Sequence, residues 1–326
     1  MMQALQRYRP ALPMPQLVAE VNKLHHEREA AIYERTHPEI FEQLPPLWRE
    51  MIAVCQPFVG GREGRLRILN FGCGTGFEAR QCLEAFGAAR IGRLVCYDPS
   101  PHMIEQCRRS LGGSGVLIEY AGDAPALDGE FDLLITNSVL HHMVDPLGEI
   151  AGLMPLLAPG AVWLSGHEPS TRYLANPECR ALLRRYEASY RWLRLLDARR
   201  YARRALRFAR VAELPEDYAG RRAFENALFE RRPPSRLVSR LVDFHVVLDE
   251  SESGAARGLD FVALEATLRG QWELVWRRTY AFLGPHYAAT LPPRWRDEAG
   301  RLAAKYQDDG ANCCLVWRKT APENRT

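Results

Sequence analysis

The chain has 326 residues, of which 47% are apolar and 25% are charged, and its formal net charge is +3. This balance is typical of globular proteins and excludes disorder throughout the chain, while the length predicts two domains or one enlarged domain. The sequence holds no apolar run long enough to span a membrane, and prolines interrupt the N-terminal segment where a signal peptide needs an unbroken apolar core. We therefore expect a cytoplasmic protein.

Helices are expected first, over residues 16–56, because Leu17, Val18, Val21 and Leu24 recur with the 3.6-residue period of a helix. Short apolar runs then alternate with helical stretches. The strands are expected at 67–71, 93–98, 116–122, 131–137 and 161–168. The helices between them are expected at 77–86, 101–111 and 145–157.

The alternation stops after Glu168 for about ninety residues and then returns. Residues 178–230 are expected to be helical, with an apolar stripe and an arginine-rich outer face. The later elements are a helix at 261–270, a strand at 271–283, a helix at 296–307 and a strand at 312–320. Strands that alternate with helices form parallel βαβ units, so the sequence predicts an α/β protein with a doubly wound sheet.

The eight cysteines are spread along the chain and form no CxxC pair. A zinc site would pair its ligands at short spacing, and a disulfide scaffold would be denser in cysteine. We expect reduced, mostly buried thiols. The histidines and carboxylates also form no pattern that predicts a metal site, so no metal is expected.

A glycine-rich loop, Gly72–Gly76, follows the first predicted strand and opens a helix. Glycines let the backbone approach a ligand closely, and the amides at a helix N-terminus favour polar or anionic groups. A dinucleotide fingerprint would need glycine where this chain has Phe77, and a P-loop would need a GK[ST] run that is absent. The loop therefore predicts a nucleoside ligand that is neither NAD nor a triphosphate.

Polar side chains follow the next strands at their C-terminal ends. Asp98 ends the second strand, where it could accept both hydrogens of a ribose diol or cap the following helix. The third strand ends at Gly122-Asp123-Ala124-Pro125, which could meet the edge of an adenine or form an ordinary turn. The fourth strand runs into Asn137-Ser138-Val139-Leu140-His141-His142. These ends converge at one edge of a doubly wound sheet.

In this order the segments resemble the class I S-adenosylmethionine-dependent methyltransferases. NFGCGTG is similar to the first motif of that family, YDPS to its ribose motif, GDAP to its adenine motif and FDLLITNSVLHHM to its fourth-strand motif. The resemblance covers about 65–170 and resumes weakly over 259–320, where the family has an antiparallel hairpin. Asn70 departs from the pattern, because many members carry an acid at this position.

The resemblance implies a seven-stranded Rossmann-like doubly wound sheet. It divides the chain into an N-terminal helical segment (1–60), a cofactor-binding core (61–170 and 259–326) and a helical lid over the acceptor pocket (171–258). It implies methyl transfer from S-adenosyl-L-methionine to a nitrogen or oxygen of a small, polar or natural-product-like acceptor. The residues it assigns to the cofactor are Asn70, Gly72, Cys73, Gly74, Gly76, Asp98, Pro99, Met103, Asp123, Ala124, Asn137 and Ser138.

A general base is needed only if the acceptor must lose a proton during attack. His141 and Glu168 both follow predicted strands at the edge where doubly wound folds place their ligands. We expect these two residues to lie within reach of the acceptor and to act in catalysis. The alternatives are that Glu168 bonds to backbone at the strand end, and that His142 is the structural member of the histidine doublet.

Residues 171–240 carry eighteen arginines and no lysine against eight acidic residues, a local charge of +10, whereas the rest of the chain is −7. We favour a lid whose aromatic side chains line the pocket of a small acceptor. The alternatives are a nucleic-acid surface, a contact for a membrane surface or acyl carrier, and a homo-oligomer interface. An RNA methyltransferase is disfavoured because the fourth strand ends in NSVLHH and not in an NPPY motif. A protein that binds the cofactor without transferring methyl is the other alternative.

Overall fold

The computed structural model describes residues 2–61, 64–122, 129–195, 213–244, 258–283 and 291–320. Seven strands form a single sheet in the order β3-β2-β1-β4-β5-β7-β6. The strands are β1 (Leu66–Phe71), β2 (Ile91–Tyr97), β3 (Ile118–Ala121), β4 (Phe131–Asn137), β5 (Leu157–Pro169), β6 (Trp272–Tyr280) and β7 (Asn312–Lys319). β7 is antiparallel to β5 and β6, and the other pairs are parallel. The predicted α/β fold and its C-terminal hairpin are confirmed.

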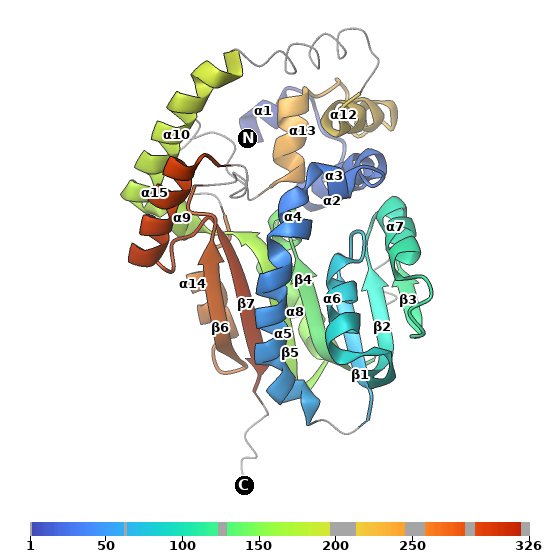
Figure 1. Ribbon diagram of the computed structural model, residues 1–326. Coiled ribbons are helices and arrows are strands. Elements are labelled where there is room, and N and C mark those ends of the chain that lie inside the picture. Colours follow the sequence, from blue (N-terminus) through green and yellow to red (C-terminus); the bar gives the residue numbers. More distant parts are fainter. Residues whose placement is uncertain are drawn as a thin grey trace.

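Helices cover both faces of the sheet, as expected for parallel strands whose apolar residues point to both sides. α5 (Leu44–Gly60), α6 (Phe77–Phe86) and α7 (Pro101–Leu111) pack on one face in one hydrophobic cluster. α8 (Pro146–Leu153) and α14 (Phe261–Leu268) pack on the other face in a second cluster. Figure 1 shows α5 and α6 in front of the strands.

A helical layer lies over the C-terminal ends of the central strands (Figure 1). It joins the N-terminal helices to part of the insertion between β5 and β6. Leu17 and Val21 of α2 (Met14–Glu29) pack against Ala219 of α12 (Pro215–Glu225) and Val238 of α13 (Ser235–Val242). α1 (Met2–Gln6), α3 (Tyr33–Thr36) and α4 (Pro38–Glu42) complete the N-terminal part.

The remaining helices of the insertion lie to one side of this layer. α9 (Thr171–Ala175) and α10 (Pro177–Leu195) neighbour α15 (Pro293–Lys305). Leu182 and Tyr186 of α10 pack against Leu291 and Trp295. This part of the apolar stripe is therefore buried against α15. Within the described ranges, no helix is long and apolar enough to cross a membrane.

Candidate functional site

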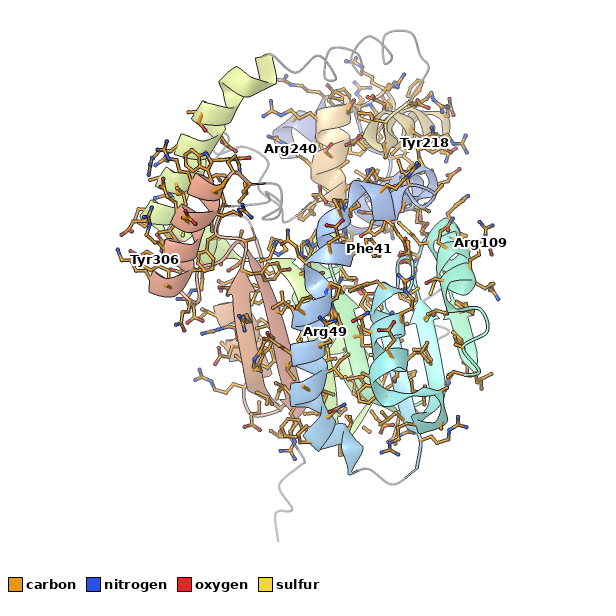
Figure 2. The ribbon with its side chains drawn as sticks, in the orientation of Figure 1. Phe41, Arg49, Arg109, Tyr218, Arg240 and Tyr306 are labelled. Carbon is orange, nitrogen blue, oxygen red and sulfur yellow. The ribbon has the colours of Figure 1, made fainter. Side chains whose placement is uncertain are left out.

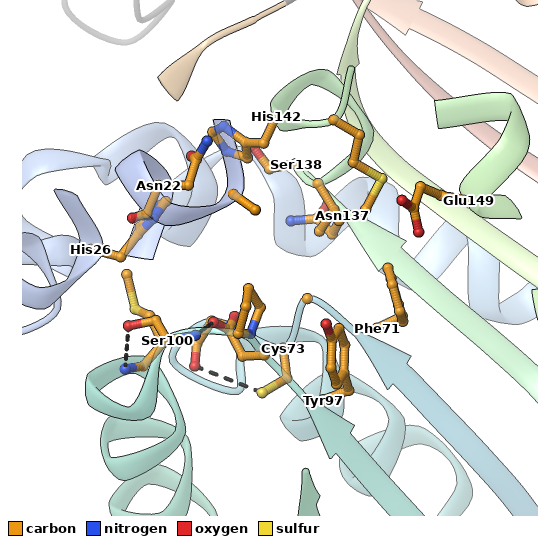
Figure 3. Close-up of a pocket in the computed structure, with 18 of the residues that line it drawn as sticks. Asn22, His26, Phe71, Cys73, Tyr97, Ser100, Asn137, Ser138, His142 and Glu149 are labelled. Atoms are coloured by element: carbon orange, nitrogen blue, oxygen red, sulfur yellow. Dashed lines mark hydrogen bonds between the residues drawn. The ribbon is translucent and has the colours of Figure 1, made fainter. Parts of the chain in front are cut away.

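A cavity of about 760 Å³ lies between the loops at the C-terminal ends of β1, β2 and β4 and the helical layer. Figure 3 shows Cys73, Tyr97 and Ser100 on its sheet side, and His26 and His142 on the opposite side. Ligand pockets of about 300–1,000 Å³ are usual in proteins. The cavity lies at the sheet edge where the sequence predicts a ligand.

The glycine loop holds a backbone shape that other residues rarely adopt. Gly72 and Gly76 have φ values of +75° and +86°. A Cβ at Gly72 would lie 2.4 Å from the Val139 side chain, and a Cβ at Gly76 would lie 3.0 Å from Cys107 Sγ. The amides of Gly72 and Cys73 both donate to the Tyr97 carbonyl oxygen at 2.8 Å. These bonds hold the loop against the end of β2.

Asp98 is buried beside this loop and lines the cavity. Its Oδ2 accepts from the Gly74 amide at 3.0 Å, and its Oδ1 accepts from the Ser100 amide at 2.8 Å. A carboxylate offers about four lone-pair positions, so each oxygen keeps acceptor capacity for a ligand. Burial raises the pKa of Asp98, and the two amides oppose that shift.

Most of the residues predicted for the cofactor come together here. Eight of them line the cavity: Gly72, Cys73, Gly74, Asp98, Pro99, Met103, Asn137 and Ser138. Two others, Asn70 and Gly76, are not among the lining residues; Asn70 is fully buried on β1. Asp123 and Ala124 lie outside the described residues.

The prediction that His141 and Glu168 line the acceptor pocket is wrong. Neither is among the lining residues, and Glu168 is fully buried. Its Oε1 accepts from the amides of Val139 and Leu140 at 2.8 and 2.9 Å. Its Oε2 accepts from the His141 amide at 3.2 Å and lies 2.9 Å from His141 Nδ1. The carboxylate therefore fastens the loop after β4 to the end of β5, and its oxygens are occupied.

We expect Glu168→Gln to lower the free energy of unfolding by about 2–4 kcal/mol, because a carboxamide would turn an NH2 group toward buried N–H donors. Denaturant unfolding checks this, with Glu84→Gln as control, an exposed acid on α6. A Glu168→Gln protein as stable as the control would contradict the anchoring role.

His142 takes the position in the cavity that we expected for His141. Its Nδ1 lies 2.7 Å from the Val242 carbonyl oxygen. A carbonyl can only accept, so Nδ1 carries the proton and Nε2 keeps a free lone pair in the neutral ring. Burial, followed by the neighbouring His141 and His26, holds the pKa of His142 well below its ordinary value. The ring is thus a neutral proton acceptor that lines the cavity.

The cavity also uses side chains of α2 that sequence reasoning missed. Asn22, Lys23 and His26 line it. The apolar period of this helix predicts its buried face and does not reveal these polar side chains. The spacing of Asn22 and His26, one turn apart beside that stripe, is the signal that could have found them.

Five aromatic side chains of the arginine-rich segment do not line the cavity: Tyr173, Tyr186, Tyr218, Phe224 and Phe229. The side chains of Tyr190, Trp192, Tyr201 and Phe208 lie outside the described part of the chain, so the lid over the acceptor pocket stays a prediction. Tyr218 lies on α12 (Figure 2). Its hydroxyl donates to Glu27 of α2 at 2.5 Å. Phe229 packs in the cluster between α2 and α12. These side chains hold the helical layer together, and α2 forms the wall that faces the cavity.

Part of this chain matches known proteins. Residues 69–163 match the family model of a methyltransferase domain. The chain is 37% identical over 102 residues to the ubiquinone biosynthesis O-methyltransferase of Methylocella silvestris, covering 30% of this chain and 38% of that protein. It is 30% identical over 128 residues to that of Cereibacter sphaeroides, covering 38% and 47%. The matches thus span less than half the length of these relatives. A solved plantazolicin methyltransferase in complex with SAH aligns with a TM-score of 0.45 at 9% identity, covering 94% of this chain and 97% of that one.

The β sheet, the glycine loop and the matched segment define a methyltransferase domain. The match over residues 69–163 supports the class I S-adenosylmethionine-dependent methyltransferase family that the sequence motifs resemble. The methyl donor of this family is S-adenosyl-L-methionine, the cofactor expected from the sequence.

Proposed function

We propose that this protein transfers a methyl group from S-adenosyl-L-methionine to a nitrogen or oxygen of a small acceptor. The observation that carries the proposal is Asp98, a buried carboxylate with spare acceptor capacity that lines a cavity beside the glycine loop. Such a group suits the hydroxyls of a ribose. The relatives named for O-methylation support transfer to oxygen.

The residues on the sheet side of the cavity would hold the cofactor. Asp98 would accept from the ribose hydroxyls, Met103 would pack near the adenine, and the loop at Gly72–Gly74 would meet the methionine portion. Asn137 and Ser138 would lie near the sulfur. Asp123 and Ala124 remain a prediction for the adenine edge. When bound, the cofactor supplies a methyl group that is activated by a positively charged sulfur.

The opposite side of the cavity would hold the acceptor. Ile40, Phe41 and Met143 give it apolar surface, while His26 and His142 add imidazole groups. This mixture suits an acceptor with an apolar or aromatic body and one hydroxyl or amine. The protein aligns that group and excludes water, which is the main requirement of a displacement at an activated methyl.

His142 would act as the general base. Its Nδ1 is held by Val242, so its Nε2 can accept the acceptor's proton as the oxygen or nitrogen attacks. Its low pKa keeps the ring neutral at pH 7. This role replaces the one predicted for His141 and Glu168.

The nucleoside site should reject nicotinamide cofactors. Phe77 occupies the position of the third fingerprint glycine at the start of α6. Its side chain is buried, and the rings of Phe41 and Trp48 pack edge-on against the Phe77 ring. We expect no saturable enhancement of NADH fluorescence at micromolar protein. Saturable enhancement that S-adenosylhomocysteine displaces would contradict the proposed cofactor selectivity.

A further inference from the structure

Glu78 is a buried carboxyl group that lines the cavity and has no role in the proposed chemistry so far. It lies in the first turn of α6, directly after the glycine loop. Within the described ranges, no lysine, arginine or histidine forms an ion pair with it. Buried acids without a cationic partner are costly, and they are concentrated at functional sites.

The carboxamides of Asn70 and Asn137 lower the pKa of this carboxyl group. Trp48 Nε1 donates to Asn137 Oδ1 at 3.2 Å, and an indole N–H can only donate. Asn137 therefore turns its NH2 group away from Trp48, and the buried side-chain atoms of Asn70 have no hydrogen-bond partner among the described residues. Gly166 leaves room for this orientation, because a Cβ there would lie 2.4 Å from Asn137 Oδ1.

Burial disfavours a negative charge on Glu78, and no ion pair among the described residues offsets that cost. The Glu78 backbone amide and the two asparagines lower its pKa, but burial outweighs them and raises the pKa to about 8. Among the described residues, the titratable groups that interact with it are the thiols of Cys82 on α6, Cys96 on β2 and Cys107 on α7. None of these can supply a positive charge. A cation could therefore pair with Glu78, and it could reach the carboxyl group through the cavity that Glu78 lines.

We propose that Glu78 is the anionic half of a cation subsite that binds the positively charged methionine portion of the cofactor. This inference rests on the proposed function. S-adenosylmethionine carries two cationic groups, the α-ammonium and the sulfonium, and either can pair with a buried carboxylate. Glu78 thereby provides from α6 the charge that Asn70 does not provide at the end of β1.

The test compares three ligands on the full-length protein by isothermal titration calorimetry. S-adenosylmethionine has both cations, S-adenosylhomocysteine keeps the ammonium alone, and 5′-methylthioadenosine has neither. We expect Glu78→Gln to weaken S-adenosylmethionine by about 10- to 100-fold, the range for loss of a charge-assisted buried contact. Binding of 5′-methylthioadenosine should change less than about threefold, since it reports only on the adenosine part.

The titration with S-adenosylhomocysteine identifies which cation of the cofactor pairs with Glu78. An equal loss for S-adenosylhomocysteine assigns the ammonium, and a loss confined to S-adenosylmethionine assigns the sulfonium. Glu84→Gln on the exposed face of the same helix is the matched control and should bind all three as the wild type does.

Two results overturn the inference. One is a Glu78→Gln protein that binds S-adenosylmethionine as tightly as the wild type, and the other is an equal loss for all three ligands. In both cases the proposed function still stands if the wild-type protein binds S-adenosylmethionine. A wild-type protein that binds none of the three ligands would refute the proposed function itself.

Proton release gives a second readout that a merely structural role would not produce. Glu78 is protonated in the empty cavity at pH 7 because of its raised pKa, and a bound cation favours the ionised form. Titration in buffers of different ionisation enthalpy should show that S-adenosylmethionine releases close to one proton more from the wild type than from Glu78→Gln. Equal proton release from the two proteins contradicts the pairing.

Discussion

Replacing Asp98 by alanine is expected to weaken S-adenosylmethionine and S-adenosylhomocysteine alike, by about 30- to 1,000-fold, or roughly 2–4 kcal/mol. The Asp98 carboxylate is buried and lines the cavity, and two amides fix its orientation. The ribose hydroxyls would lose two charge-assisted hydrogen bonds, and water in this buried site would not fully replace them. Calorimetry with both ligands measures the effect.

The Asp98 variant also needs a control for folding, because its oxygens hold the amides of Gly74 and Ser100. Asp98→Asn keeps the size and one amide acceptor but loses the charge, and it turns an NH2 group toward the other amide, so it should fold with lower stability and bind more weakly. Asp132→Asn is the matched control: Asp132 is buried, its Oδ2 accepts from the Arg67 amide at 2.9 Å, and it does not line the cavity. Wild-type affinity in a folded Asp98→Asn protein would refute the ribose assignment.

Replacing His142 by glutamine is expected to lower kcat by about 10²- to 10⁴-fold, the usual contribution of a positioned base. Glutamine can still donate to the Val242 carbonyl oxygen, so the loop should keep its shape while the proton acceptor is lost. The affinity for S-adenosylhomocysteine should stay within about threefold of the wild type. Transfer of labelled methyl to a small phenol with a single hydroxyl gives the rate.

The pH profile separates this role from a packing role. The base must be neutral, and burial holds the pKa of His142 well below its ordinary value. The rate should therefore stay high as the pH falls through 6.5 and decline only below it, and the decline should be lost in His142→Gln. His102→Gln, at an exposed position on α7, is the control. An unchanged rate in His142→Gln would show that the acceptor arrives deprotonated or loses its proton to water.

Local signals fixed much of this fold in advance. α6 and α7 have the bounds that the sequence predicts, 77–86 and 101–111. Gly76 and Gly87 flank α6, and Ser100 caps α7 just before Pro101. β4 was predicted at its observed bounds as an apolar run that is buried on both faces. Such a run is typical of a central parallel strand and can be recognised without knowing which strands lie beside it.

The site was only partly predictable, because its missing parts depend on contacts between distant segments. Asp98 follows from its place at a strand end. Which member of the doublet faces the cavity depends on Glu168, which holds His141, and on Val242, which holds His142. The wall formed by α2 depends on its packing against α12. Apolar periodicity reports that a face is buried, but it does not identify the partner.

The most direct test of the central claim is a crystal structure of the protein grown with S-adenosylhomocysteine. We predict ligand density in the cavity, with the ribose hydroxyls on Asp98, the methionine portion at the glycine loop and the sulfur toward Asn137. The space beside His142 should remain open for an acceptor. Density elsewhere on the protein, or an empty cavity at saturating ligand, would contradict the assignment of this cavity as the methyl-donor site.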